Sequence, residues 1–233
     1  MWNWCVWKAY HLSLIILCCS TLKFNHGTDT EIDLQFDDEG NCYAVATSDI
    51  EPGSQLRMSY GCPTNPSQLF ATYGFLDRSS PATFCKMMNY QPTPELIDIG
   101  LDNSRMLFYH DTGDISDEVW DVVLYDILKV DRAAQESFYN AHMAGDYDTK
   151  QAFHQQYIGE TSTAIKKHVD TFLETLETLS ARTIGQDLNI HPRIPVILEH
   201  NQFVKETFLN VKAKLDPIVA QSAGNYAEAF APR

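Results

Sequence analysis

The second half of the sequence carries apolar residues at helical spacing, and this pattern restricts the fold more than any other feature of the chain. Residues three or four positions apart lie on one face of an α-helix. Three segments show such a face: Val119, Val122, Val123, Ile127 and Val130; Ile165, Val169, Phe172, Leu173, Leu176 and Leu179; Ile197, Phe203, Phe208, Val211 and Leu215. Ser116, Asp117 and Glu118 provide a helix start before the first segment. The pattern predicts an all-helical region of four or five helices.

The first half of the sequence has the alternation and turn residues of β-structure. Between residues 32 and 60, "IDLQF", "CYAVAT" and the segment 55–60 read as strands, separated by turns at Gly40-Asn41 and Pro52-Gly53. These strands predict an antiparallel meander, followed by a short helix from about Ser67 to Tyr73. Residues 79–95 read as a connector, and "SRMLFYHDTGD" (104–114) as a strand closed by a glycine turn. The fold class is therefore expected to be α+β.

Charge and cysteine content limit the classes of partner. The 233 residues hold 31 acids and 17 bases, a net charge of −14, which argues against a nucleic-acid surface. A basic protein partner fits this charge, and so does solubility alone. The six cysteines show no C-x-x-C pair and no zinc spacing, so neither a metal site nor a disulfide framework is expected.

The N-terminal segment 1–23 has two interpretations. Its apolar run from Leu12 to Cys19 has the outline of a signal peptide, but it is too short to span a bilayer. We expect no stable membrane association, and an intracellular location (cytosol, nucleus or plastid) in preference to secretion.

Four short motifs then occur in order: "FNH" at 24–26, "IEPGSQL" at 50–56, "MSYG" at 58–61 and "YGF" at 73–75. Together they resemble the C-terminal half of a SET domain, and the segment 193–218 resembles the closing helix of the helical domain in the Rubisco large-subunit methyltransferase-like class. The resemblance implies a partial antiparallel β SET fold followed by an all-α substrate-binding domain. The domains would be 1–23 (outside the family), 24–78 (half SET), 79–220 (helical) and 221–233 (tail).

The resemblance also implies an activity, the N-methylation of a lysine in a protein substrate with S-adenosylmethionine as cofactor. Such a site must hold a neutral amine in line with the methyl group and exclude water, and tyrosine side chains can wall it. The residues implied are Tyr60 as the catalytic group, Tyr73 in the substrate channel, and Asn25, His26, Tyr73, Gly74 and Phe75 against the cofactor.

The chain departs from the family ahead of Phe24. The first half of a SET domain, with its Gly-x-Gly cofactor loop, is not matched, and Leu22 and Gly27 replace the usual Asp and Ser. We therefore expect a truncated product whose residues 1–23 are not native SET sequence, which leaves its activity open. Three functions follow. The first is a protein methyltransferase acting on lysine, with histidine as the alternative target, and the second is a non-catalytic protein-binding module that uses the helical domain. The third, ranked last, is a secreted or membrane-tethered domain, which rests on the N-terminal apolar run alone. Without the resemblance, Tyr60 reads as a core tyrosine at the end of a strand. Oligomeric state and substrate are not indicated.

Overall fold

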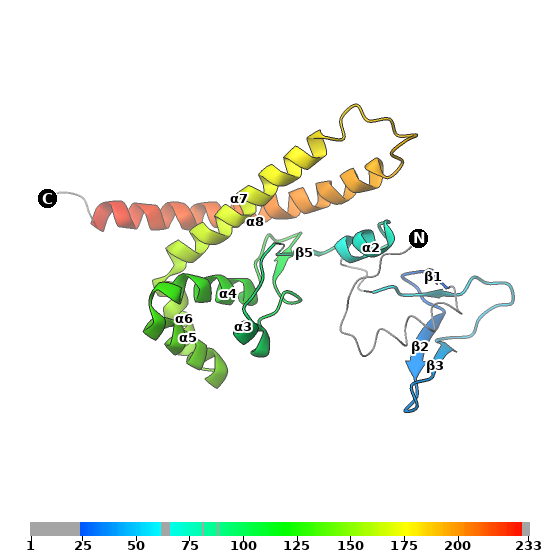
Figure 1. Cartoon of the computed structure of the whole chain (residues 1–233), viewed down its shortest axis with the longest axis horizontal. Coiled ribbons are helices and arrows are strands. Elements are labelled where there is room, and N and C mark those ends of the chain that lie inside the picture. The colour runs from blue at the N-terminus through cyan, green and yellow to red at the C-terminus, as the bar shows by residue number, and fades with distance from the viewer. Residues whose placement is uncertain (1–23, 62–65, 81, 88, 230–233) are drawn as a thin grey trace. The chain divides into compact units, whose positions relative to one another are not determined.

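The computed structural model describes residues 24–61, 66–80, 82–87 and 89–229 (Figure 1). The chain divides into two compact units, residues 1–82 and 83–233. Helices make up about 53% of the structure and the strands form small sheets, which confirms the predicted α+β class. The predicted segment 1–23 lies outside the described residues.

Among its described residues, the N-terminal unit contains four short strands and one helix. Their bounds are β1 (Asn25–His26), β2 (Ile32–Phe36), β3 (Cys42–Ala46), β4 (Arg57–Met58) and α2 (Pro66–Tyr73). Strands β2 and β3 form an antiparallel hairpin in which Ile32 lies opposite Ala46. Gly40 takes the left-handed conformation in its turn, with φ of 83°. The predicted hairpin and the predicted helix up to Tyr73 are both confirmed.

The predicted meander is wrong at its third strand. The expected strand 55–60 is reduced to β4, which pairs in parallel with β1 and not with the hairpin. An ion pair explains this pairing: the backbone N–H of Arg57 donates to Glu31 Oε2 at 2.8 Å, and its guanidinium Nη2 donates to Glu31 Oε1 at 2.6 Å. The Glu31 N–H in turn donates to the Arg57 carbonyl at 3.2 Å. Glu31 and Arg57 thus contact each other through both backbone and side chains, and the bidentate ion pair is of a strong kind. The contact joins the segment before β2 to β4, on either side of the hairpin.

The C-terminal unit begins with a short sheet and continues as helices. Its elements are β5 (Phe84–Lys86), α3 (Pro94–Asp98), β6 (Leu107–Tyr109), α4 (Asp117–Ile127), η1 (Leu128–Val130), α5 (Arg132–Ala144), α6 (Tyr147–Gln156), α7 (Ile158–Ala181) and α8 (Ile194–Ala229). Strand β6 was predicted. Strand β5, which pairs antiparallel with it, and the first two residues of α3 lie in the segment that was read as connector. That reading was wrong because β5 is only three residues long and shows little alternation.

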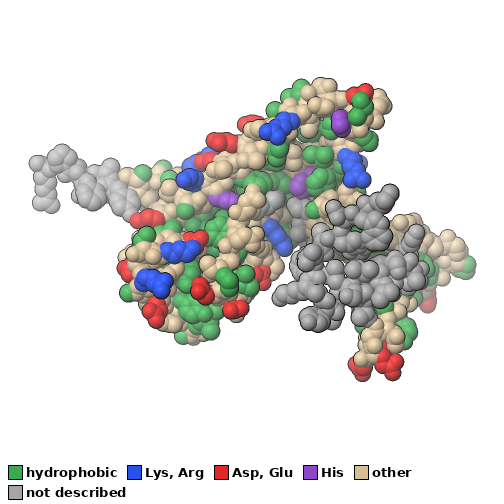
Figure 2. Space-filling model, viewed as in Figure 1, with side chains coloured by type: hydrophobic (Ala, Val, Ile, Leu, Met, Phe, Trp, Pro, Cys, Tyr) green, Lys and Arg blue, Asp and Glu red, His purple; other side chains and the backbone are tan. Residues whose placement is uncertain are grey.

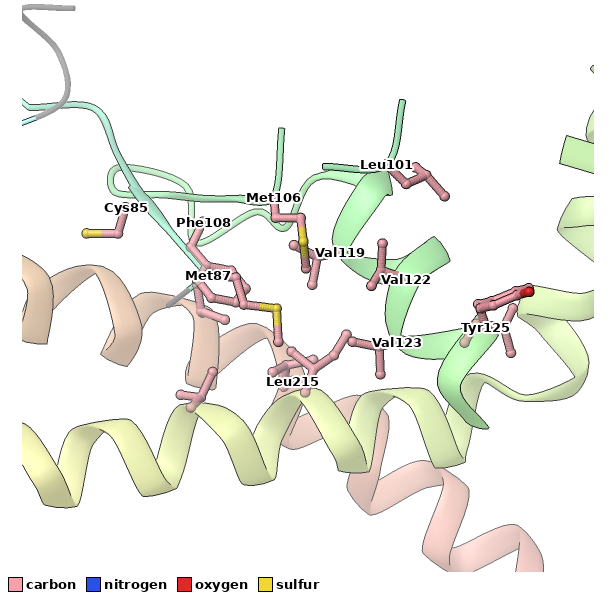
Figure 3. Close-up of a cluster of buried hydrophobic side chains, with 14 of the residues drawn as sticks. Cys85, Met87, Leu101, Met106, Phe108, Val119, Val122, Val123, Tyr125 and Leu215 are labelled. Atoms are coloured by element: carbon pink, nitrogen blue, oxygen red, sulfur yellow. The ribbon is translucent and has the colours of Figure 1, made fainter. Parts of the chain in front are cut away.

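The apolar faces predicted for the helices form one core. Figure 3 shows side chains from β5, β6, α4 and α8 gathered above α7. Phe208 of α8 is fully buried and packs against the rings of Phe172 and Phe108, with centroid distances of 4.6 and 5.2 Å. Leu179 was predicted on the buried face of α7 but is 47% exposed. Val130 was predicted on the buried face of its helix but is 95% exposed. It is exposed because α4 ends at Ile127 and the chain turns into η1.

Ser116 lies at the N-cap of α4, as expected, but its hydroxyl does not cap the helix. It accepts a hydrogen bond from the Leu107 N–H at 3.0 Å and donates to the Arg105 carbonyl at 2.8 Å. The residue therefore fastens the start of α4 to strand β6.

Helices α7 and α8 are the two longest elements and pack against each other, joined by the segment 182–193. On the face of the helical unit drawn in Figure 2, acidic and basic side chains are interspersed. Within the described residues, the structure contains no helix with the length and apolar character required to cross a membrane.

Candidate functional site

Four of the predicted site residues lie together in the N-terminal unit. The ring centroids are 5.4 Å apart for His26 and Tyr60, 4.5 Å for Tyr60 and Tyr73, 6.2 Å for Tyr73 and Phe75, and 5.5 Å for Phe75 and His26. The four rings thus form a closed cycle, which we call the aromatic cluster. It joins β1, the segment after β4 and the end of α2, which is the proximity that a single shared site requires.

His26 is the most constrained member of the aromatic cluster. Its Nδ1 lies 3.2 Å from the backbone N of Tyr60, and its Nε2 lies 3.0 Å from Asp77 Oδ2. Because a backbone N–H can only donate, Nδ1 must accept, and Nε2 carries the proton that is donated to Asp77. The ring therefore links β1 to the segments on either side of α2.

Asp77 supports His26 from behind and was not singled out from the sequence. Burial acts to raise the pKa of Asp77, but hydrogen bonds from Ser79 and Thr28, with His26 as a further donor, outweigh it and hold that pKa well below its usual range. The Thr28 hydroxyl donates to Oδ2 at 2.6 Å, and the Ser79 backbone N–H donates to Oδ1 at 2.9 Å. A fixed, ionised carboxylate thus orients the imidazole.

Tyr60, the predicted catalytic residue, is held at both ends. Its backbone N–H is bound by His26, and its hydroxyl donates to the Phe24 carbonyl at 2.5 Å. The side chain is partly buried, so the ring forms a wall of the aromatic cluster while the hydroxyl is anchored to the backbone. Its role in catalysis stays a prediction.

Tyr73, Gly74 and Phe75 end helix α2. The Tyr73 side chain is 47% exposed, so its ring has an open face towards solvent. Gly74 has a φ of 77° and its N–H donates to the Phe70 carbonyl at 2.9 Å, which is the usual glycine termination of a helix. This capping accounts for the glycine without a cofactor. The side chain of Asn25 is exposed, and the ring contacts described above do not include it.

Gly27 replaces the serine that the resemblance leads one to expect, and the structure gives a reason for it. The residue is buried, and its N–H donates to the Met58 carbonyl at 3.1 Å. A Cβ at this position would lie 2.9 Å from the Cβ of Arg57 and 3.0 Å from the Asp29 carbonyl oxygen. The close pairing of β1 with β4 therefore requires glycine here.

A second polar cluster lies in the helical unit and was missed in the sequence. The buried Asp121 of α4 binds Lys150 Nζ at 2.6 Å and His154 Nε2 at 2.8 Å, both from α6. His142 of α5 accepts a hydrogen bond from Lys150 at 3.2 Å. Lys150 and His154 are four residues apart and share a helix face, but this spacing does not indicate that Asp121 is their partner.

Comparison with known proteins returned no match: no family model, no curated protein and no solved structure is similar to this chain. The resemblance to SET domains accordingly stays a prediction from the quoted motifs.

Proposed function

We propose that the aromatic cluster is the methyl-transfer site of an S-adenosylmethionine-dependent protein methyltransferase that acts on a lysine side chain, within a partial SET fold. The observation that carries the proposal is the meeting of His26, Tyr60, Tyr73 and Phe75, which come from three separate segments. Histidine is the alternative target.

The chemistry of the aromatic cluster supports this proposal. Aromatic faces attract cations, and both reactants of this reaction are cationic before the transfer: the sulfonium of the cofactor and the protonated lysine. An apolar, partly desolvated wall favours the neutral amine, because burial lowers a lysine pKa. Tyr60, fixed through its hydroxyl and its N–H, would keep the amine in line with the methyl carbon.

The residues of the aromatic cluster fit the cationic part of S-adenosylmethionine. The exposed ring of Tyr73 and its neighbour Phe75 would hold the sulfonium, and the bound cofactor would supply the methyl group. The N–H groups of Gly27, Tyr60 and Gly74 donate within the protein. The proposal therefore assigns the cofactor to ring faces and not to these donors.

A non-catalytic protein-binding module is the second candidate, and the distribution of the core favours it. The large cluster of buried side chains runs from Cys85 to Leu215 and lies wholly in the helical unit. Among the described residues of the N-terminal unit, the buried large apolar side chains are Ile32 and Leu69. A helical unit with a core of its own can present a binding surface whether or not the N-terminal unit catalyses a reaction.

Calorimetric titration of the 233-residue protein with S-adenosylmethionine separates the two candidates. The methyl-transfer proposal predicts saturable binding, weakened about ten-fold or more in Tyr73→Ala, since a cation on an aromatic face is worth up to about 2 kcal/mol. Tyr147→Ala removes a tyrosine that is 79% exposed on α6 and is the matched control, for which the affinity is expected to be unchanged.

Two results would contradict the methyl-transfer proposal. One is the absence of binding at millimolar S-adenosylmethionine by protein that unfolds cooperatively, and this result would leave the binding module. The other is binding that Tyr73→Ala and Phe75→Leu leave unaltered, which would place the cofactor away from the aromatic cluster.

A further inference from the structure

The segment that joins α7 to α8 gathers exposed apolar side chains. Ile184 is 81% exposed, Ile190 70% and Leu188 52%, and Leu179 at the end of α7 is 47% exposed. Single exposed apolar residues are normal on any protein, whereas four of them within twelve positions of the chain make this segment a candidate interaction surface. We call this group, residues 179–197, the hairpin tip.

A cavity of about 380 Å³ lies in the hairpin tip, and its charged lining is basic. Arg182 at the end of α7 and Arg193 just before α8 both line it, together with His191, and no acidic residue does so. Its apolar lining includes Ile190, Ile194 and Ile197. This combination suits an apolar group that carries a negative charge.

The two arginines lie in a chain with many more acidic than basic residues. Among the described residues, several Lys and Arg side chains of the helical unit pair with carboxylates, as in Lys150–Asp121, Lys166–Asp170 and Arg105–Glu118, whereas others, such as Arg132, do not. Arg182 and Arg193 form no ion pair within the described part of the chain. Their guanidinium groups therefore remain available to bind a carboxylate in the bidentate manner.

The acidic residue of the tip does not compensate these charges. The Asp187 carboxylate accepts from the backbone N–H of Asn189 at 2.8 Å and from its side-chain amide at 3.1 Å. It is thus used to shape the turn. With two arginines against one aspartate, the tip is weakly basic on a protein of net charge −14.

We propose that the hairpin tip binds an acidic peptide segment of a partner protein, with one apolar side chain of the peptide in the cavity and its carboxylates on Arg182 and Arg193. Ile184 and Leu188 are exposed but do not line the cavity, so the surface that needs covering is wider than the cavity, which favours a peptide over a small anion. An anionic bilayer is disfavoured, because recognition of such a surface uses clusters of about four to eight basic residues.

The proposal does not depend on whether the N-terminal unit is a methyl-transfer site or is non-catalytic. Variants of the hairpin tip are expected to leave S-adenosylmethionine binding as it is in the wild type, so failure of one proposal is distinguishable from failure of the other.

The test is a selection of random twelve-residue peptides on the full-length protein, followed by fluorescence anisotropy with the peptides that enrich. We expect enriched sequences with acidic residues around a Leu, Ile or Phe, and affinity that falls as salt rises. The double variant Arg182→Glu/Arg193→Glu should weaken binding about ten-fold or more, because each attraction becomes a like-charge repulsion.

Matched variants control for net charge and for the apolar contact. Arg132→Glu changes the charge of an exposed arginine on α5 that has no ion pair among the described residues, and it should leave the affinity unchanged. Ile190→Ser should weaken binding without any change of charge. Thermal melting by circular dichroism verifies that each variant folds, which is expected because the substituted side chains are exposed.

Three outcomes overturn the proposal. The first is a selection that enriches no peptide, or only peptides without acidic residues. The second is equal weakening by Arg132→Glu and by the tip variants. The third is binding of the protein to vesicles that contain 30% phosphatidylserine, if the tip variants abolish this binding and the enriched peptides do not compete with it. That result would assign the hairpin tip to a membrane surface.

Discussion

The polar cluster around Asp121 permits a quantitative prediction of stability. In Asp121→Asn the side chain keeps its shape but loses the charge that faces Lys150 and His154. The Asp121 side chain is only 4% exposed and that of Lys150 16%, so water cannot replace the lost partner. Removing one member of a buried ion pair costs about 3–5 kcal/mol, because the remaining charge stays buried without compensation.

The magnitude can be converted into a melting temperature. For a chain of 150–250 residues, 1 kcal/mol shifts Tm by about 2–4 °C, so Asp121→Asn should lower Tm by about 6–20 °C at pH 7. Differential scanning calorimetry measures the shift. Lys214→Ala is the control: it breaks an ion pair with Asp114 in which the two side chains are 55% and 56% exposed, and it should change stability by less than about 1 kcal/mol.

The dependence on pH gives a second check of the same cluster. Burial acts to raise the pKa of Asp121, but hydrogen bonds from His154 and Lys150 outweigh it and lower that pKa from its ordinary value. A lowered carboxyl pKa stabilises the folded state above the unfolded value of about 3.9, and this contribution is lost as pH falls through the folded pKa. The difference between wild type and Asp121→Asn should therefore shrink below pH 4. A Tm loss at pH 7 no larger than that of Lys214→Ala would refute the reasoning.

Two further predictions concern the core of the helical unit. Gly113→Ala should destabilise the protein by about 2–4 kcal/mol, because the residue has φ of 68° and a Cβ there would lie 2.6 Å from the carbonyl carbon of Asn210. Gly145 has the same φ of 68°, but a Cβ there would have no atom within 4 Å, so Gly145→Ala should cost only about 1–2 kcal/mol. Thermal melts compare the two variants, and equal losses of stability would contradict the predicted clash at Gly113. Burial raises the pKa of the Cys85 thiol to about 12, although a hydrogen bond from Thr207 acts in the opposite direction. Because the thiolate is the reactive form, iodoacetamide at pH 8 should leave Cys85 unmodified in the native protein and label it after unfolding. Peptide mass spectrometry measures the labelling. Rapid labelling in the native state would show that this side chain opens to solvent.

The elements that the sequence predicts well are those whose signal is local. Apolar spacing marks the faces of α4, α7 and α8, and the turn residues around Gly40 mark the β2–β3 hairpin. Val130 shows the limit of this approach, since its spacing continues the buried face of α4 while the helix itself ends three residues earlier.

Pairings between distant residues could not be predicted in the same way. The parallel pairing of β1 with β4 depends on Glu31 and Arg57, which are 26 positions apart and carry no periodic signal. Asp121 likewise acquires its partners only when α4 and α6 pack. At the candidate site, the motifs named the four residues of the aromatic cluster, but not Asp77, whose contact with His26 spans 51 positions.

The closure of the chain between Glu31 and Arg57 has a consequence for how the N-terminal unit can vary. The two residues join the ends of the segment 32–56 directly, through backbone and side-chain hydrogen bonds. The segment 32–56, which contains the hairpin, is thus a loop whose two ends are held together at this contact. Because the entropic cost of closing a loop grows only with the logarithm of its length, doubling the length of this loop would cost about 0.6 kcal/mol. The hairpin can therefore be lengthened or exchanged while His26 and Tyr60, on either side of the closure, keep their contact.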